Sequence, residues 1–185
     1  MIDPKSIGGE KDIVLRTQTS PMQIRSVQTM NLNPPFKVIA PGRVFRREKV
    51  DATHESTFYQ FEGLGISEDM TIADFKGIIA EFFSSFFQKE VVVRLRPSYF
   101  PFVEPGFEVD MSCPFCMQKG CRVCKHTGWI EVMGAGMVHP NVLKNMNIDA
   151  TQYQGFAFGG AIDRLTMIRH GITDIRMFWS GDIRF

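Results

Sequence analysis

Three short segments that alternate polar with aromatic residues constrain this chain most, because each has the two-residue period of a β-strand. They are residues 44–48 (VFRRE), 58–62 (FYQFE) and 100–104 (FPFVE). Successive side chains of a strand point to opposite faces, so the alternate residues of each segment share one face. These residues are Arg46 and Glu48; Phe58, Gln60 and Glu62; and Phe100, Phe102 and Glu104. Such a face is a poor hydrophobic core but a good floor for a ligand with phosphate, ammonium, a metal ion and flat rings.

A surface salt bridge between Arg46 and Glu48 explains the first segment equally well, since charge pairs of this kind are common and weakly stabilising. The repetition over three segments favours a ligand site. Arg164 adds a second cation directly after the glycine-rich stretch 155–160. An arginine can bind phosphate in a fork or lie flat on an aromatic ring.

The length of 185 residues fits one domain with a sizeable core, and a formal charge of +1 gives no global basic field for nucleic acid. Any RNA contact is therefore expected to be local or supplied by a partner. No apolar run reaches the ~18 residues of a membrane span, and the first residues lack a signal-peptide pattern. We therefore expect a soluble, cytoplasmic protein without a membrane partner.

Four cysteines lie within twelve residues, at Cys113, Cys116, Cys121 and Cys124. In a chain without a secretory signal, two Cys-x-x-Cys pairs favour a metal over disulfides, and four thiolates satisfy tetrahedral zinc. Gly120 permits the sharp turn that the short spacer needs. A filled site of this kind has no open position and is structural. The alternative is a surface loop of reduced, metal-free cysteines.

The remaining pattern predicts an α+β domain, with an antiparallel sheet and two or three helices packed on one side. A helix is expected with Ser20 as its N-cap, another after Thr71 with Asp74 completing a capping box, and a third over 160–170. The helix after Thr71 carries an apolar stripe that includes Ile72, Ile78 and several phenylalanines. The expected strands cover 36–47, broken at Pro41-Gly42, then 58–66 and 91–96, and two more that end near Asp110 and resume at Trp129. Gly134 and Gly136 are expected to let the backbone approach another group closely.

Several motifs resemble one family. Residues 42–48 (GRVFRRE), followed by His54-x-x-x-Phe58, resemble motif 2 of class II aminoacyl-tRNA synthetases, and residues 155–164 (GFAFGGAIDR) resemble motif 3. Residues 19–25, 96–105 and 134–140 are similar to the alpha subunit of bacterial phenylalanyl-tRNA synthetase, and the resemblance runs from about Leu15 to the last residue. It implies a class II synthetase-like catalytic core over residues 1–185, with a zinc-loop insertion at 112–128.

The resemblance implies that the phenylalanine carboxylate attacks the α-phosphate of ATP and that the phenylalanyl group then moves to tRNA(Phe). Arg46 would hold the α-phosphate and the carboxylate, Glu48 would orient the adenine end, and His54 would contact the outer phosphates. Phe58 and Arg164 would lie on the two faces of adenine, an arrangement worth roughly 1–2 kcal/mol. Arg46, Glu48, His54 and Arg164 are therefore the candidate catalytic residues.

The same resemblance implies a phenylalanine pocket and a magnesium ligand. Glu104 is the expected magnesium ligand, with Glu62 as a second candidate. An apolar pocket end without a polar partner should disfavour tyrosine. The ammonium group would be held by Gln18, Ser20, Gln60 and Glu62, and the ring would meet Phe100, Phe102, Val103 and Ala157.

Nothing in the chain resembles the N-terminal coiled coil of the family, and the segment before Leu15 lacks motif 1, which builds the dimer interface. We therefore expect a part of the alpha subunit, whose family enzyme joins two alpha and two beta subunits. A non-catalytic phenylalanine-binding module, or an inactive fragment that needs its missing interface, is the alternative. Ala161, where motif 3 usually has glycine, favours that alternative. A third hypothesis is a zinc-centred module whose cysteine loop contacts a partner chain.

Overall fold

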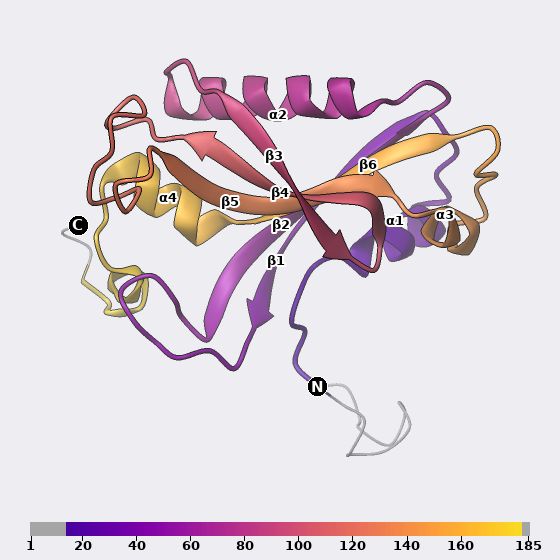
Figure 1. Ribbon diagram of the computed structural model, residues 1–185. Coiled ribbons are helices and arrows are strands. Elements are labelled where there is room, and N and C mark those ends of the chain that lie inside the picture. The colour runs from indigo at the N-terminus through magenta and orange to yellow at the C-terminus, as the bar shows by residue number, and fades with distance from the viewer. Residues whose placement is uncertain (1–13, 183–185) are drawn as a thin grey trace.

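The computed structural model describes residues 14–182, and a single six-stranded sheet forms its centre (Figure 1). The strand order is β1-β2-β6-β5-β4-β3, and every neighbouring pair is antiparallel. The strands are β1 (Phe36–Phe45), β2 (Thr57–Ser67), β3 (Val93–Phe100), β4 (Val103–Ser112), β5 (Trp129–Val138) and β6 (Gln154–Ala161). The helices are α1 (Met22–Met30), α2 (Ile72–Phe87), α3 (Pro140–Asn145), α4 (Ile162–His170) and the 3-10 helix η3 (Ile175–Trp179). The predicted α+β class is confirmed, while predictions that concern residues 1–13 lie outside the described residues.

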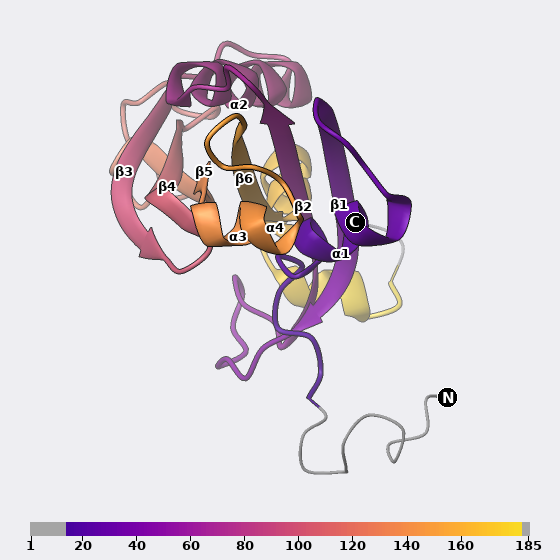
Figure 2. The same ribbon diagram turned by 90° about the vertical axis from the view of Figure 1, so that its right-hand side faces the viewer.

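Helices cover both faces of the sheet, so the expectation that they pack on one side is wrong. α2 and α4 contribute Phe75 and Leu165 to one core cluster. α1 and α3 lie side by side at one end of the sheet (Figure 2), and they contribute to a second cluster. The neighbouring β6 residues Phe156 and Ala157 belong to different clusters. Because adjacent residues of a strand point to opposite faces, the two clusters lie on opposite sides of the sheet.

The helix expected after Thr71 is confirmed as α2, and both hydrogen bonds of its capping box are present. Phe75, Ile79 and Phe83 are at most 1% exposed, and burying each such side chain stabilises the fold by about 1.5–3 kcal/mol. Ile72 and Ile78 were expected in the same apolar stripe, but they are 37% and 39% exposed. The buried stripe is therefore narrower than the sequence pattern indicates.

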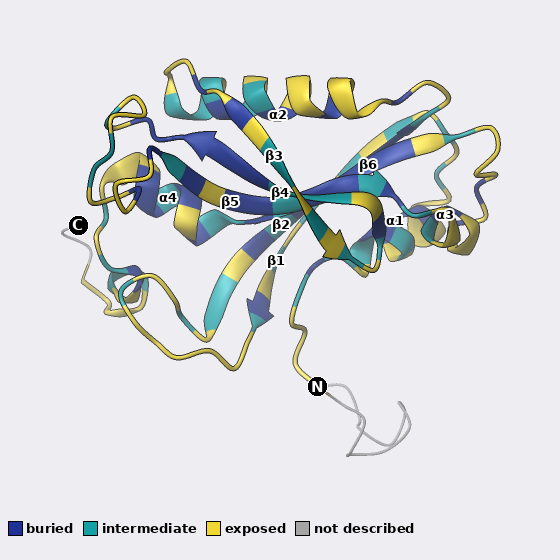
Figure 3. Ribbon diagram, in the orientation of Figure 1, coloured by how far each residue is buried: buried dark blue, intermediate teal, exposed yellow. Residues whose placement is uncertain are grey.

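Two expected strand boundaries are wrong. β1 continues through Pro41-Gly42, which pair with Phe61 and Gln60 of β2. β1 is an edge strand, where the missing N–H of proline leaves no partner unpaired. The strand β1 ends at Phe45, before Arg46 and Glu48, and the exposed loop that follows is the long hairpin connection that the sequence indicates (Figure 3).

The segment 100–104 is not one continuous strand, because a tight turn at residues 101–102 interrupts it. β3 ends at Phe100, β4 begins at Val103, and these two residues pair across the turn. Phe100 and Phe102 therefore do not share a strand face with Glu104. Similarly, Gly160 belongs to β6, and the last helix begins only at Ile162.

Ser20 is not the N-cap of the first helix. α1 begins at Met22, and its N-cap Pro21 makes no side-chain capping hydrogen bond. The Ser20 hydroxyl donates instead to the Glu62 carboxylate of β2. None of the helices in residues 14–182 is both long and apolar enough to cross a bilayer.

Candidate active site

A pocket of about 400 Å³ opens between the central strands, the β1–β2 loop and the start of α4. Among the non-cysteine residues predicted as ligand-binding or catalytic, all except Glu104 line this pocket. They are Gln18, Ser20, Arg46, Glu48, His54, Phe58, Gln60, Glu62, Phe100, Phe102, Val103, Ala157 and Arg164. Side chains that are distant in sequence thus converge on one cavity.

Glu62 provides a buried carboxylate at the pocket wall, with 3% of the residue exposed. It accepts hydrogen bonds from Thr19 Oγ1 (3.3 Å), Ser20 Oγ (3.1 Å) and Gln23 Nε2. Burial raises the pKa of Glu62 to about 7, against the opposing effect of these three donors. A carboxylate that is costly to ionise in the free protein is well suited to bind a cation, which would restore the lost solvation.

Thr19 and Gln23 are two hydrogen-bond partners of Glu62 that the site prediction did not include. Both are at most 2% exposed, and both act through Glu62. Gln23 Oε1 is buried without a hydrogen-bond partner. The spacing of Ser20 and Gln23, three residues apart at the start of a helix, was the signal in the sequence that could have grouped them.

Arg46 is the first residue of the β1–β2 loop, and its side chain contacts residues of the sheet and of the segment before α1. Its Nε donates to Thr17 O at 2.9 Å, its Nη2 lies 3.5 Å from Gln60 Oε1, and its guanidinium carbon lies 5.1 Å from the Phe58 ring centroid. The ion pair with Glu48, the simpler explanation of the sequence pattern, is present at 4.0 Å. Arg46 therefore combines that pair with contacts on the pocket floor.

Arg164 and His54 approach the pocket from two other elements. Asp163, which precedes Arg164 in the first turn of α4, accepts a hydrogen bond from Tyr59 N at 2.6 Å and ties α4 to β2. His54 Nδ1 lies 3.0 Å from Asp51 Oδ1 within the β1–β2 loop. The backbone N–H of Thr53 and the neighbouring side chains hold the pKa of Asp51 below its usual range.

The apolar end of the pocket is built from the β3–β4 turn and β6. The rings of Phe100 and Phe102 are 6.0 Å apart with an interplanar angle of 27°. Ala157 of β6 is 1% exposed and lines the same end. A Cβ at Gly134 would lie 2.9 Å from the Phe100 ring. The close approach expected at Gly134 is therefore confirmed, and the approaching group is the Phe100 ring.

Glu104 lies outside this pocket. Its side chain is 74% exposed, and His139 Nε2 is 3.3 Å from its Oε2. Two carboxylates that the site prediction missed, Glu108 of β4 and Glu131 of β5, line the pocket instead. The turn at residues 101–102 interrupts the strand pattern over 100–104, which explains why Glu104 does not lie with Phe100 and Phe102 at the pocket.

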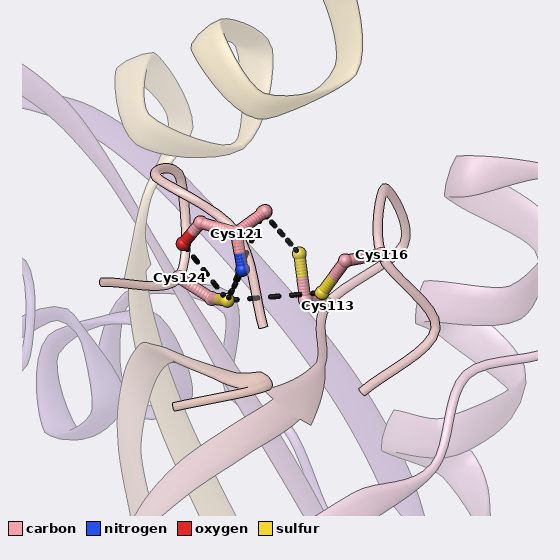
Figure 4. Close-up of side chains that lie close together, drawn as sticks. All are labelled: Cys113, Cys116, Cys121 and Cys124. Atoms are coloured by element: carbon pink, nitrogen blue, oxygen red, sulfur yellow. Dashed lines mark hydrogen bonds between the residues drawn. The ribbon is translucent and has the colours of Figure 1, made fainter. Parts of the chain in front are cut away.

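The four cysteines form one cluster in the loop between β4 and β5 (Figure 4). All four sulfur atoms lie within 4.8 Å of one another, and none forms a disulfide. The Sγ atoms of Cys113 and Cys121, of Cys116 and Cys124, and of Cys121 and Cys124 are each 3.7 Å apart. A tetrahedron with Zn–S bonds of about 2.3 Å has edges of about 3.8 Å. The donor set and its spacing therefore fit a zinc ion.

Hydrogen bonds also favour a thiolate in this cluster. Cys124 Sγ accepts from Cys121 N at 3.1 Å and from Gly128 N at 3.3 Å. Burial opposes ionisation of Cys124, but these backbone donors and the neighbouring cysteines lower its pKa to about 6. Burial raises the pKa of Cys113 to about 12.

Comparison with known proteins identifies the class to which this fold and pocket belong. The sequence model of the family described as "tRNA synthetases class II core domain (F)" matches residues 2–185, and the chain belongs to this family. A pyrrolysyl-tRNA synthetase structure from Desulfitobacterium hafniense has the same fold, with a TM-score of 0.62 and 14% identity over 92% of this chain and 55% of that one.

Two relatives narrow the resemblance further. The chain is 53% identical over 174 residues to the "Phenylalanine--tRNA ligase alpha subunit" of Pseudomonas savastanoi pv. phaseolicola, a match that covers 94% of this chain and 51% of the relative. It is 56% identical over 172 residues to the protein of that name from Francisella philomiragia subsp. philomiragia, covering 93% of this chain and 50% of the relative. The resemblance to phenylalanyl-tRNA synthetase alpha subunits is thereby confirmed, and the chain spans about half the length of these relatives.

Proposed function

We propose that this chain is the catalytic core of an enzyme that activates phenylalanine with ATP and transfers it to tRNA(Phe). The observation that carries the proposal is the pocket itself. It joins a buried carboxylate at Glu62, an apolar end with Phe100, and two arginines, Arg46 and Arg164, on one cavity. These groups match the ammonium, the ring and the phosphates of the two substrates.

In the first step, a carboxylate oxygen of phenylalanine attacks the α-phosphorus of ATP, and the bond to pyrophosphate breaks. In the second step, a ribose hydroxyl at the tRNA 3′ end attacks the acyl carbon and AMP leaves. Arg46 would stabilise the charge that develops on the α-phosphate, and Glu62 would fix the ammonium. Positioning and charge stabilisation of this kind can supply most of the rate enhancement.

The apolar end of the pocket would favour phenylalanine over tyrosine. Phe100, Phe102, Val103 and Ala157 offer no side-chain hydrogen-bonding group to a para-hydroxyl. Burying that hydroxyl without a partner is unfavourable, although an apolar pocket rejects an added hydroxyl only about 100-fold. Editing elsewhere in the assembly would supply the remaining accuracy.

Magnesium that accompanies ATP would be held by the pocket carboxylates. Glu108 and Glu131 lie on neighbouring strands and line the cavity. Carboxylate oxygens are the ligands that magnesium prefers, and the ion would neutralise charge on the phosphates. Glu104, the carboxylate expected from the sequence, lies outside the pocket, so a magnesium ion there would be separate from the one that accompanies ATP.

The cysteine cluster would hold a structural zinc ion with all four coordination positions filled by Cys113, Cys116, Cys121 and Cys124. Its role would be to close the β4–β5 hairpin. The 3.7 Å sulfur separations support this proposal.

The proposed partners are tRNA(Phe) and a beta subunit, in an assembly of two alpha and two beta chains. Relatives named as alpha subunits support a partner subunit, and the proposed reaction supports a cytoplasmic location, where tRNA is charged.

The test is phenylalanine-dependent exchange of labelled pyrophosphate into ATP by this chain with magnesium. We expect exchange, and we expect Arg46→Ala to abolish it while the fold is retained. Binding of phenylalanine by calorimetry without exchange would instead support the non-catalytic phenylalanine-binding module. A chain that neither binds phenylalanine nor catalyses the exchange would refute the proposed function.

A further inference from the structure

One arginine outside the pocket lining binds three carboxylates at once. Arg96 Nη1 lies 2.8 Å from Glu108 Oε2, and Arg96 Nη2 lies 2.8 Å from Glu131 Oε2. Its Nε and Nη2 also donate to Asp110, at 2.7 Å and 3.0 Å. Arg96 thus joins its own strand, β3, to β4 and β5, directly beside the two carboxylates that line the pocket.

Asp110 is the buried member of the group of carboxylates that Arg96 binds. Its side chain is 3% exposed, and it also accepts hydrogen bonds from Arg94 Nε and Nη2, at 3.0 Å and 2.7 Å. Burial opposes ionisation of Asp110, but the hydrogen bonds from Arg96 and Arg94 prevail and lower its pKa. The hydrogen bonds to Asp110 and Glu131 in turn raise the pKa of Arg96. Asp110 therefore fixes the plane of the Arg96 guanidinium.

The two arginines differ in what they touch. Arg94 contacts Asp110 and lies with its guanidinium carbon 4.3 Å from the Trp129 ring centroid. Only Arg96 continues from Asp110 to Glu108 and Glu131. Removing either arginine leaves Asp110 with one arginine partner. A substitution of Arg94 therefore measures the structural cost of losing one partner of Asp110, and a substitution of Arg96 adds the loss of the contacts with Glu108 and Glu131.

We propose that Arg96 is a positioning residue that holds the Glu108 and Glu131 carboxylates at the spacing needed for the magnesium-bearing end of ATP. Without this cation, two like charges on adjacent strands would repel each other and turn toward solvent. The planar fork of arginine can serve several carboxylates at once, which a lysine ammonium on its flexible stem does less well. Partners that orient metal-binding groups typically change metal affinity about 10–100-fold when they are lost.

This inference rests on the proposed function, and its test compares Arg96→Gln with the matched control Arg94→Gln in the full chain. The measurements are the magnesium concentration for half-maximal pyrophosphate exchange, the KM values for ATP and phenylalanine, and calorimetric binding of phenylalanine in EDTA. We expect Arg96→Gln to raise the magnesium requirement and the KM for ATP at least about tenfold. We expect phenylalanine binding in EDTA to stay within about twofold, and Arg94→Gln to leave all values within about twofold.

Equal effects of the two substitutions would overturn the inference, and so would a loss of phenylalanine binding that matches the change in ATP. Arg96→Lys is expected to recover only part of the ATP affinity. If the unmodified chain does not turn over, calorimetric titration of ATP with magnesium measures the same contrast. An unmodified chain that binds no ATP would overturn the proposed function and this inference together, whereas ATP binding that is unchanged in Arg96→Gln would overturn the inference alone.

Discussion

Replacing Glu62 by glutamine is expected to stabilise the protein at neutral pH and weaken phenylalanine binding. Burial raises the pKa of Glu62 from its ordinary value of 4.5 to about 7. The folded state therefore favours the protonated carboxyl more than the unfolded state does. The stabilising contribution is complete below pH 4.5 and is lost as the pH rises to about 7.

The size of this stability change follows from the difference between the pKa of Glu62 in the unfolded and in the folded state. Each pH unit between 4.5 and about 7 corresponds to about 1.4 kcal/mol, so ionisation of Glu62 lowers the free energy of unfolding by about 3 kcal/mol above pH 7. A glutamine side chain is uncharged, so its burial carries no cost of removing an ion from water. The Glu62→Gln protein should therefore gain about 3 kcal/mol over the unmodified protein between pH 4.5 and pH 8.

The surroundings of Glu62 can accept the amide. Its Oε2 would remain the acceptor for Thr19 and Ser20, as in the carboxylate. The new NH2 group would face Gln23, whose Oε1 has no hydrogen-bond partner in the present arrangement. A flip of the Gln23 amide would pair both groups, so a folding defect from the substitution is not expected.

The assay is urea unfolding of both proteins at several pH values from 4.5 to 8, with Glu68→Gln, on an exposed residue, as the control. A gap in unfolding free energy between Glu62→Gln and the unmodified protein that does not change with pH would refute the reasoning. At pH 8 phenylalanine affinity should fall at least about tenfold in Glu62→Gln, because a hydrogen bond to a charged group contributes about 1.5–3 kcal/mol. For the unmodified protein, affinity should fall about tenfold per pH unit below pH 7.

Three further outcomes are expected. Ala157→Gly should enlarge the apolar pocket end and admit para-chlorophenylalanine, because the Ala157 methyl is buried there; unchanged discrimination in exchange assays would contradict this placement. Cys113→Ser should abolish binding of one zinc ion per chain, measured by atomic absorption, and lower the melting temperature; equal metal content in both proteins would exclude the four-cysteine site. Phe58→Ala should weaken ATP binding about 5–30-fold, since stacking on a base contributes roughly 1–2 kcal/mol; a similar loss in phenylalanine affinity would argue against a stacking role.

Much of the fold was predictable from sequence patterns that lie within a single helix or strand. The capping box at Thr71 and Asp74 marks α2 correctly, because it depends only on residues within one turn of the chain. The break expected at Pro41 was wrong because the tolerance of proline depends on whether its strand lies at the sheet edge. That property belongs to the tertiary structure and cannot be read from the segment alone.

The candidate site was predictable where its residues belong to a recognisable sequence motif. Arg46, Phe58 and Arg164 were found because a motif places them, and all three line the pocket. Glu108 and Glu131 were missed because an isolated carboxylate in a strand pattern resembles any solvated face. Only the pairing of β4 with β5, and the arginine that contacts both carboxylates, shows that they lie together at the pocket.

Two of the local rules that fail in this chain fail at the pocket. Ser20 has the sequence position of a helix cap, yet its hydroxyl donates to Glu62 and α1 begins without a side-chain cap. The segment 100–104 alternates like a strand, yet it turns so that Phe100 and Phe102 meet at the pocket end. A helix cap contributes about 1 kcal/mol, and a buried carboxylate with a raised pKa opposes stability further. Sites that serve a ligand are where such costs persist, since the bound ligand offsets them. Phenylalanine should therefore stabilise this protein most strongly above pH 7, where Glu62 is ionised and the ammonium of the substrate supplies the missing partner.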